Sequence, residues 1–251
     1  MVEDKTFHVP AGTLELESNA LPAGGIAIVI GSSGGIGRAL HERLSAEPRF
    51  GAVLGLGRRS SPPLDLTDEA SIAAAARHVG ALGADVRLVI DASGILQGDG
   101  LTPEKSWRDL DIAQMTRAFA VNAIGPALLM KHFLPLLPRQ GRSVFATLSA
   151  RVGSIGDNRL GGWYSYRASK AALNQFMRTA AIELGRRQPA ALCVALHPGT
   201  VATSLSAPFV KAGLDVQTPQ QAADRLLDTI ERLPPGSSGG FFDHRGNPVP
   251  W

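Results

Sequence analysis

The sequence contains a single cysteine, Cys193, so no disulfide can form within the chain. Cys193 lies in the apolar run 191–196, where we expect it to be a small buried hydrophobic side chain. A chain of 251 residues, 44% of them hydrophobic, is long enough to bury a core without covalent or metal cross-links. We therefore expect neither a structural disulfide nor a metal site.

The chain also has little excess charge of one sign. The 25 Lys and Arg stand against 22 Asp and Glu, and the arginine pairs 58–59 and 186–187 are isolated. No basic run of the kind that follows a nucleic-acid backbone is present, so we expect no nucleic-acid partner. One or two arginines could still bind a single phosphate.

Long apolar runs are missing as well. No stretch approaches the roughly 20 apolar residues that a membrane helix needs, and residues 1–24 hold no apolar segment typical of a signal sequence. We therefore expect a cytoplasmic protein without a membrane partner. Residues 1–24 carry no clear structural signal and are interpreted as an N-terminal extension.

The rest of the chain alternates short β-rich apolar runs with longer helical patterns. This order, without period-2 alternation in the runs, is typical of a parallel sheet covered by helices on both faces. We expect one α/β domain over 25–251, a doubly wound, mostly parallel Rossmann fold, with a candidate lid at about 200–217. The expected strands are 26–30, 53–56, 86–90, 143–148 and 192–196, and the expected helices are 36–46, 68–79 (N-cap Thr67), about 112–137 with a break near 125–126, 164–187 and 219–233.

A glycine-rich turn, residues 31–37, follows the first expected strand directly. Glycines at such a junction let the backbone approach a pyrophosphate, whose charge then faces the helix N-terminus. A tight turn for close packing would also use glycine, but the position at the first strand–helix junction favours a dinucleotide site. The candidate cofactor residues here are Gly31, Ser32, Ser33, Gly35, Ile36 and Gly37.

The end of the second expected strand indicates which dinucleotide is bound. An acidic residue there would bind the ribose hydroxyl of NAD, whereas an arginine pairs with the 2′-phosphate of NADP. The chain reads Gly57-Arg58-Arg59-Ser60, without an acid. A solvated loop is the alternative reading of the arginine pair. At this location the sequence favours NADP(H), with Arg58 as the main phosphate ligand and Arg59 assisting.

Tyr166 and Lys170 are four residues apart in the longest helical pattern, which places both side chains on one helix face. Carbonyl reduction needs a proton donor for the developing alkoxide, and a nearby ammonium lowers the pKa of a tyrosine. Tyr164 has Ala168 at the same spacing and so lacks such a partner. The pair gains weight from the glycine turn upstream.

The spacing of Gly31, Gly35 and Gly37 together with the Tyr166–Lys170 pair resembles the short-chain dehydrogenase/reductase family. The resemblance covers about residues 25–251, with Ile30 where that family more often has threonine. The shortened segment after Arg59, the run 161–166 and the ending 241–251 resemble the C-factor-type and small carbonyl-reductase-type members.

The resemblance implies roles for further residues. Asn122 would hold a water that links the lysine to a proton relay, and Asp65-Leu66 would contact the adenine although the helix that usually precedes this pair is reduced or absent. The turn Asp91-Ala92-Ser93-Gly94 resembles an Asn-Asn-Ala-Gly turn of the family with only its glycine kept. The implied cofactor contacts in the second half of the site are Ala92, Gly94, Pro198, Gly199, Val201 and Thr203.

The serine that positions the substrate carbonyl is irregular. The family pattern is Ser-Ser-x-x-Gly, and alignment on Gly153 puts Ala150 in the position of the second serine. Ser149 is one residue away, on a strand where successive side chains point to opposite faces. We favour Ser149 as the fourth catalytic residue, and Ser154 is the alternative.

These features predict an NADP(H)-dependent oxidoreductase that interconverts a small, apolar carbonyl compound and its alcohol. The alternative is an NADP(H)-binding sensor or signalling protein of the same fold with little or no turnover. A sugar-nucleotide epimerase is disfavoured because such chains carry a large C-terminal substrate domain. By resemblance, we expect a homodimer or homotetramer formed by the long helices around Asn122 and Tyr166.

Overall fold

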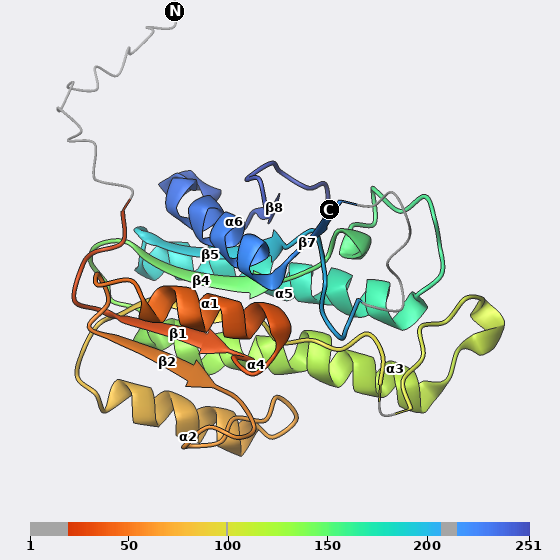
Figure 1. Cartoon of the computed structure of the whole chain (residues 1–251), viewed down its shortest axis with the longest axis horizontal. Coiled ribbons are helices and arrows are strands. Elements are labelled where there is room, and N and C mark those ends of the chain that lie inside the picture. Colours follow the sequence, from red (N-terminus) through yellow and green to blue (C-terminus); the bar gives the residue numbers. More distant parts are fainter. Residues whose placement is uncertain (1–19, 99, 207–214) are drawn as a thin grey trace, which may run out of the picture.

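The computed structural model describes residues 20–98, 100–206 and 215–251. Its centre is a parallel sheet of six strands in the order β2-β1-β3-β4-β5-β8 (Figure 1). The strands are β1 (Ile26–Ile30), β2 (Ala52–Leu56), β3 (Val86–Asp91), β4 (Ser143–Leu148), β5 (Ala191–His197) and β8 (Phe241–Asp243). A separate pair of two-residue strands, β6 (Thr200–Val201) and β7 (Val216–Gln217), joins the two described ends of the expected lid.

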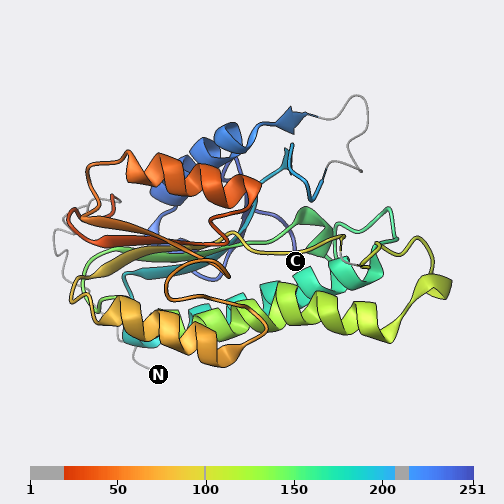
Figure 2. The ribbon, with the colours of Figure 1, turned by 60° about the horizontal axis from the view of Figure 1, so that its bottom comes forward.

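Helices cover both faces of the sheet, as Figure 2 shows. Helices α1 (Gly35–Ser45) and α6 (Pro219–Arg232) lie on one face, and α2 (Glu69–Gly80), α4 (Gly125–Phe133) and α5 (Tyr164–Arg187) lie on the other. Neighbouring residues of one strand therefore enter different cores: Ile28 packs on the α4–α5 side and Val29 on the α1–α6 side. The expected fold, a doubly wound α/β domain with continuous apolar strands, is confirmed.

Helix α2 begins one residue later than the sequence indicated. Asp68 is its N-cap and accepts a hydrogen bond from the Ala70 N–H at 2.9 Å. The Thr67 hydroxyl donates instead to the Asp65 carboxylate at 2.7 Å, so the expected cap at Thr67 was wrong. A carboxylate at the N-cap also interacts favourably with the helix dipole, which gives Asp68 the advantage.

The expected break at Gly125-Pro126 is not a break. Helix α3 (Ile112–Phe119) continues through a π-helical turn (Ala120–Ile124) into α4 and a 3-10 turn (Leu134–Leu136). In the π turn the Gly125 N–H donates to the Ala120 carbonyl, five residues back. This extra residue accommodates Pro126, which cannot donate, within one continuous helical rod.

The same rod, Ile112–Leu136, is 25 residues long and apolar enough, with a mean hydropathy of 1.3, to cross a membrane by length and composition. This corrects the expectation that no segment reaches that length. Leu129 and Phe133 of the rod are fully buried in the core beneath the sheet. In all, 39% of its most apolar window is buried inside this structure.

Three other segments complete the comparison with the sequence. No helix occurs between Arg59 and Asp65 in the structure, as expected. Leu21, within the expected extension, is 3% exposed and packs into the α1–α6 core, so the folded part begins before residue 25. Residues 1–19 and the lid residues 207–214 lie outside the described residues.

Strand order places the site. β1 lies between β2 and β3, and the chain leaves β1 to one side for β2 and then crosses to the other side for β3. The carboxyl ends of β1 and β3 thus flank the point where the winding reverses, which is where doubly wound sheets bind ligands.

Candidate active site

The glycine turn lies at this reversal point. The Gly31 N–H donates to the Leu56 carbonyl at 2.8 Å, and Gly31 has a φ of +78°, a conformation that favours glycine. A side chain at Gly37 would collide with the Gly31 carbonyl oxygen. Helix α1 then begins at Gly35 with no side-chain cap and no acidic residue in its first turn. The first N–H groups of α1 are therefore left for an anion.

The segment after β5 folds back onto this turn. Gln217 of β7 donates to the Pro198 carbonyl at 3.0 Å and so ties the two ends of the lid together. Thr203 lies against Gly35 so closely that a β-carbon on the glycine would be 2.7 Å from the Thr203 Cγ2 atom. Two segments predicted from distant parts of the sequence to hold the cofactor are thus in contact.

Arg58 and Arg59 follow β2 and are exposed. Within the described residues neither guanidinium has a hydrogen bond or ion pair. Two hydrogen bonds from Thr67 hold the pKa of Asp65 below its usual value, and the positive charge of Arg58 adds a smaller effect in the same direction. Leu66 next to it packs against Gly125, where an added β-carbon would be 2.7 Å from the Leu66 Cβ atom. The arginine pair and Asp65-Leu66 therefore occupy one loop at the end of β2.

Asn122 in the π turn clamps the loop that follows β3. Its Oδ1 atom accepts from the Ile95 N–H at 2.8 Å and its Nδ2 atom donates to the Ile95 carbonyl at 2.8 Å. Nδ2 also contacts the Ser169 hydroxyl at 3.2 Å, which links the loop to α5. Asn122 is 0% exposed, so this mid-helix amide is buried and its polar atoms bond to protein groups.

Lys170 reaches the same place from α5. It is 3% exposed, and its ammonium donates to the Leu148 carbonyl at the end of β4 at 2.8 Å. A side chain at Gly94 would lie 3.3 Å from the Asn122 Oδ1 atom and 3.4 Å from the Lys170 Nζ atom. Gly94 therefore marks the point where the sequence-predicted amide and ammonium meet the turn after β3.

Tyr166 lies one turn before Lys170 and is partly exposed. Its ring contacts Trp163 edge-on, with centroids 6.2 Å apart, and its hydroxyl has no hydrogen-bond partner within the described residues. Loss of water around the ring raises the pKa of Tyr166 to about 12. The expected lowering of this pKa by Lys170 is thus absent from this structure, where the Lys170 ammonium binds Leu148.

The hydroxyls of the two candidate serines both form hydrogen bonds within the protein. The Ser149 hydroxyl donates to the Asn174 Oδ1 atom at 2.6 Å and is buried between β4 and α5. The Ser154 hydroxyl accepts from the Asp157 N–H at 3.1 Å. This geometry does not support Ser149 as the residue that holds the substrate carbonyl, because its hydroxyl is already committed to α5. Ala150 occupies the position that the family motif gives to serine.

Three contributors were missed. Glu104 accepts from the Ser165 N–H at 3.2 Å and from the Ser165 hydroxyl, and so anchors the start of α5 next to Tyr166. Gln97 donates to the Ser204 carbonyl at 3.0 Å and ties the loop after β3 to the lid. These pairs are 61 and 107 residues apart in the sequence, so no local pattern could have revealed them. The third, Asp91, is buried at the end of β3.

His197 at the end of β5 is not placed for proton transfer. Burial, together with the nearby His244 and Arg151, lowers the pKa of His197 to about 4, so its imidazole is neutral near pH 7. Its Nδ1 atom is buried without a hydrogen-bond partner among the described residues. These features fit a packing residue better than a catalytic base.

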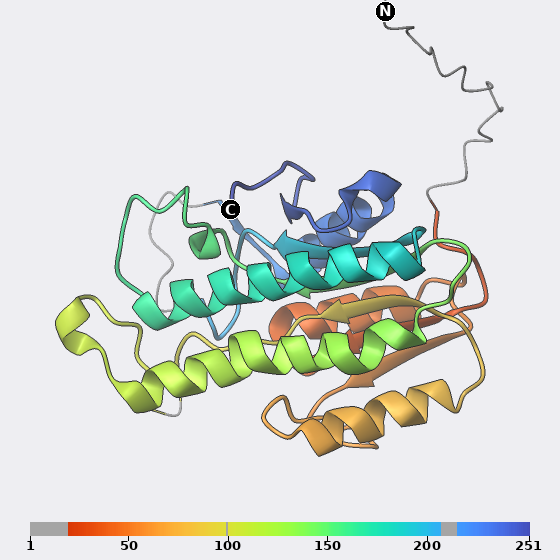
Figure 3. The ribbon, with the colours of Figure 1, turned by 180° about the vertical axis from the view of Figure 1, so that it is seen from behind.

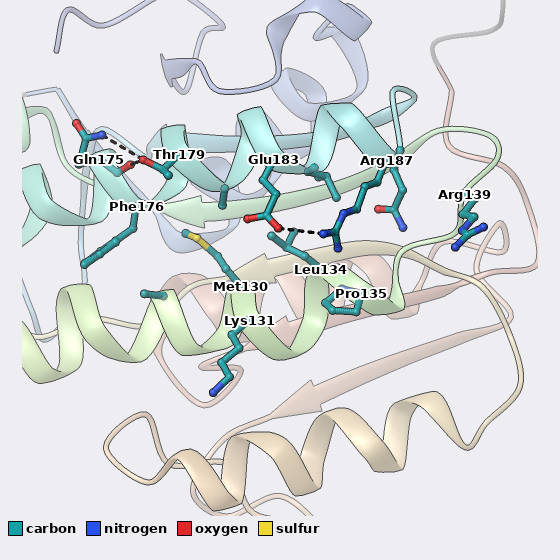
Figure 4. A pocket seen from close by; sticks show the side chains of 14 residues that line it. Met130, Lys131, Leu134, Pro135, Arg139, Gln175, Phe176, Thr179, Glu183 and Arg187 are labelled. Carbon is teal, nitrogen blue, oxygen red and sulfur yellow. Dashed lines mark hydrogen bonds and ion pairs between the residues drawn. The ribbon is translucent and has the colours of Figure 1, made fainter.

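A large groove of the described part of the molecule lies away from this site. It measures about 1080 Å³ and lies between the outer faces of α4 and α5, with Met130, Phe176 and Glu183 in its lining (Figure 4). α4 and α5 run side by side across that face of the molecule (Figure 3). None of the sequence-predicted catalytic residues lines it.

The serine geometry yields a direct prediction. We expect Ser149→Ala to lower kcat/KM less than tenfold, because the Ser149 hydroxyl already donates its proton to Asn174. Ser154→Ala tests the alternative, because the Ser154 oxygen accepts from Asp157 and its own proton is not used by that bond. We expect Ala150→Ser to raise kcat/KM, because it adds a donor at the motif position. Steady-state kinetics with one carbonyl substrate measures all three. A tenfold or larger loss for Ser149→Ala, with an unchanged melting temperature, would restore Ser149 as the substrate-positioning group.

Known proteins match the chain over most of its length. A family model described as Enoyl-(Acyl carrier protein) reductase matches residues 41–231. The 1-hydroxy-2-glutathionyl-2-methyl-3-butene dehydrogenase of Rhodococcus is 33% identical over 233 residues, which cover 89% of this chain and 98% of that protein. The C-signal protein of Myxococcus xanthus is 39% identical over 144 residues, which cover 57% of this chain and 82% of that protein.

Solved structures also match this fold. A crystal structure of an NADPH-bound carbonyl reductase from chicken fatty liver superposes with a TM-score of 0.79 and 26% identity, over 93% of this chain and 96% of that one. A family model matches more than half of the chain, and a relative is 33% identical over nearly all of it. The chain belongs to the short-chain dehydrogenase/reductase family of oxidoreductases, which act on CH–OH and C=O groups.

Proposed function

We propose that the protein is an NADP(H)-dependent oxidoreductase that reduces a small, apolar carbonyl compound, or oxidises the corresponding alcohol, with Tyr166 as the proton donor or acceptor. The observation that carries this proposal is the meeting of the Asn122 amide and the Lys170 ammonium at Gly94, one helical turn from the unpartnered Tyr166 hydroxyl. The nicotinamide, when bound, supplies or accepts the hydride.

Proton transfer falls to the protein. With its pKa raised to about 12, Tyr166 is protonated near pH 7 and can donate to a developing alkoxide. The phenolate that remains needs a nearby positive charge, and Lys170 on the same helix face is the charged group in reach. Its pKa is lowered to about 8 because burial disfavours the ammonium, so Lys170 is mostly charged at pH 7.

Two exposed arginines favour NADP(H) over NAD(H). Arg58 and Arg59 are unpaired at the end of β2, the place where a 2′-phosphate lies in a fold of this kind. The related carbonyl reductase holds NADPH, which supports the same choice. The first N–H groups of α1 would bind the pyrophosphate.

We expect Tyr166→Phe to lower kcat by at least about a thousandfold while leaving the Kd for NADPH within about threefold, because only the proton donor is lost. Tyr164→Phe is the matched control, since Tyr164 is exposed two residues away and should retain nearly full activity. NADPH consumption and fluorescence titration provide the two measurements. Equal activity of both variants would contradict the assignment.

We expect Arg58→Ala to weaken NADPH binding at least tenfold and NADH binding by less than about threefold, since only NADPH carries the phosphate that the guanidinium pairs with. Titration of both nucleotides with wild type and variant measures the two ratios. Similar losses for NADPH and NADH would show that Arg58 does not bind the 2′-phosphate.

A sensor that binds NADP(H) without turnover is the second candidate. The 39% identity with the C-signal protein and Ala150 in the serine position favour it. The complete set of Asn122, Tyr166 and Lys170 favours the enzyme. Tight NADPH binding without NADPH consumption on a broad panel of carbonyl compounds would decide for the sensor.

We also propose that the α4–α5 groove is the contact between two copies of the chain. Its lining combines half-exposed Phe176 with charges of both signs, among them Lys131, Glu183 and Arg187, so two copies related by a twofold axis can match apolar to apolar and acid to base. We expect Phe176→Glu to convert the assembly to monomers, whereas Leu82→Glu, at an exposed leucine outside the groove, leaves it intact. Light scattering after size exclusion measures both, and a monomeric wild type would contradict the proposal.

A further inference from the structure

The end of β3 carries a buried carboxylate that the proposed mechanism leaves unused. Asp91 is 1% exposed and stands opposite Thr147 of β4 in the sheet register. Val89 and Phe145, two residues earlier on the two strands, point into the core covered by α4 and α5. Asp91 therefore faces the side of the sheet from which Lys170 enters. A carboxylate in such a place is costly unless it is paired.

Hydrogen bonds to Asp91 come from uncharged donors. The Thr147 hydroxyl donates to Oδ2 at 2.8 Å, the Ser93 N–H donates to Oδ1 at 3.0 Å, and the Ser93 hydroxyl also donates to Oδ1. These bonds favour the ionised form but leave its charge uncompensated. Burial acts more strongly and raises the pKa of Asp91.

Lys170 supplies the compensating charge. The residues next to those that bind Asp91 contact the Lys170 ammonium. Leu148 follows Thr147 and accepts the hydrogen bond of the ammonium. Gly94 follows Ser93, and a β-carbon on it would lie 3.4 Å from the Lys170 Nζ atom. The charge of Lys170 opposes the rise in the pKa of Asp91, and Asp91 opposes the fall in the pKa of Lys170.

No other charged group of the described residues competes for this pair. β4 contains no charged residue, and Asn122 is the side chain that the π turn contributes. Arg167 on α5 donates to the carbonyls of Gly161 and Gly162, and Tyr166 is neutral. The carboxylate and the ammonium therefore depend on each other.

We propose that Asp91 is a positioning residue: its carboxylate is the buried counter-charge that keeps Lys170 protonated in the site. Without it, the Leu148 carbonyl would remain as the hydrogen-bond partner of the ammonium, and Lys170 would lose its proton at a lower pH. The importance of this charge for turnover rests on the proposed function of Lys170, whereas the pairing itself does not.

The pairing is tested by a lysine NMR titration. The chain has five lysines, so selectively ¹³C- and ¹⁵N-labelled lysine gives a simple spectrum, and Lys170→Met identifies the signal. We expect Lys170 to titrate near pH 8 in the wild type and roughly one pH unit lower in Asp91→Asn, which keeps the shape and removes the charge. Thr147→Val, which removes a hydrogen bond to Asp91 but keeps the charge, should shift it by less than half as much.

Kinetics supply a second readout. We expect kcat/KM of Asp91→Asn to approach the wild-type value at pH 6 and to lie about tenfold below the wild-type value at pH 8.5. A pKa lower by one unit changes the protonated-to-neutral ratio of Lys170 tenfold. A purely structural role for Asp91 would lower kcat/KM equally at every pH. If no carbonyl compound is turned over by the wild type, the proposed function fails while the NMR titration still decides the pairing.

An unchanged pKa of Lys170 in Asp91→Asn would overturn the proposal. So would failure of both Asp91→Asn and Asp91→Ala to fold while Thr147→Val folds, because Asp91 would then serve the sheet rather than Lys170. Melting temperatures of all the variants separate these outcomes.

Discussion

The paired hydrogen bonds between the Asn122 amide and the backbone of Ile95 are the contact on which the site depends. They fix the loop after β3 against the π turn and, through Ser169, against α5. Gly94, the residue before Ile95, can then lie beside Asn122 and the Lys170 ammonium, where a β-carbon would be 3.3 Å from the amide oxygen and 3.4 Å from the ammonium. Without these hydrogen bonds, the loop after β3 and helix α5 would not be held together by Asn122.

Desolvation is the second constraint, and it acts on every titratable group at the centre of the site. Burial raises the pKa of Tyr166 and Asp91 and lowers that of Lys170. Each group is thereby pushed toward its neutral form, which suits a proton donor but works against an ammonium. A buried carboxylate and a buried ammonium that act on each other offset part of this cost, because each stabilises the charge of the other.

Much of the site could be anticipated from local patterns. The glycine turn, the arginine pair after β2 and the four-residue spacing of Tyr166 and Lys170 are each contained within a few residues. Five of the six sheet strands are apolar runs that lie within a residue of the expected positions. The sixth strand, β8, was not predicted as a strand. Local patterns work here because backbone geometry alone relates these residues to one another.

The sequence by itself determined the α/β class, the position of the glycine turn and the placement of Tyr166 and Lys170 on one helix, since strand burial and helix periodicity follow from neighbouring residues. Only the tertiary structure decided where the Ser149 hydroxyl points, that the charge of Asp91 acts on Lys170 and that Glu104 holds the start of α5. Each of these depends on strand register or on contacts between distant segments. The Ser149 hydroxyl bonds to Asn174 of α5, and no local propensity encodes that contact.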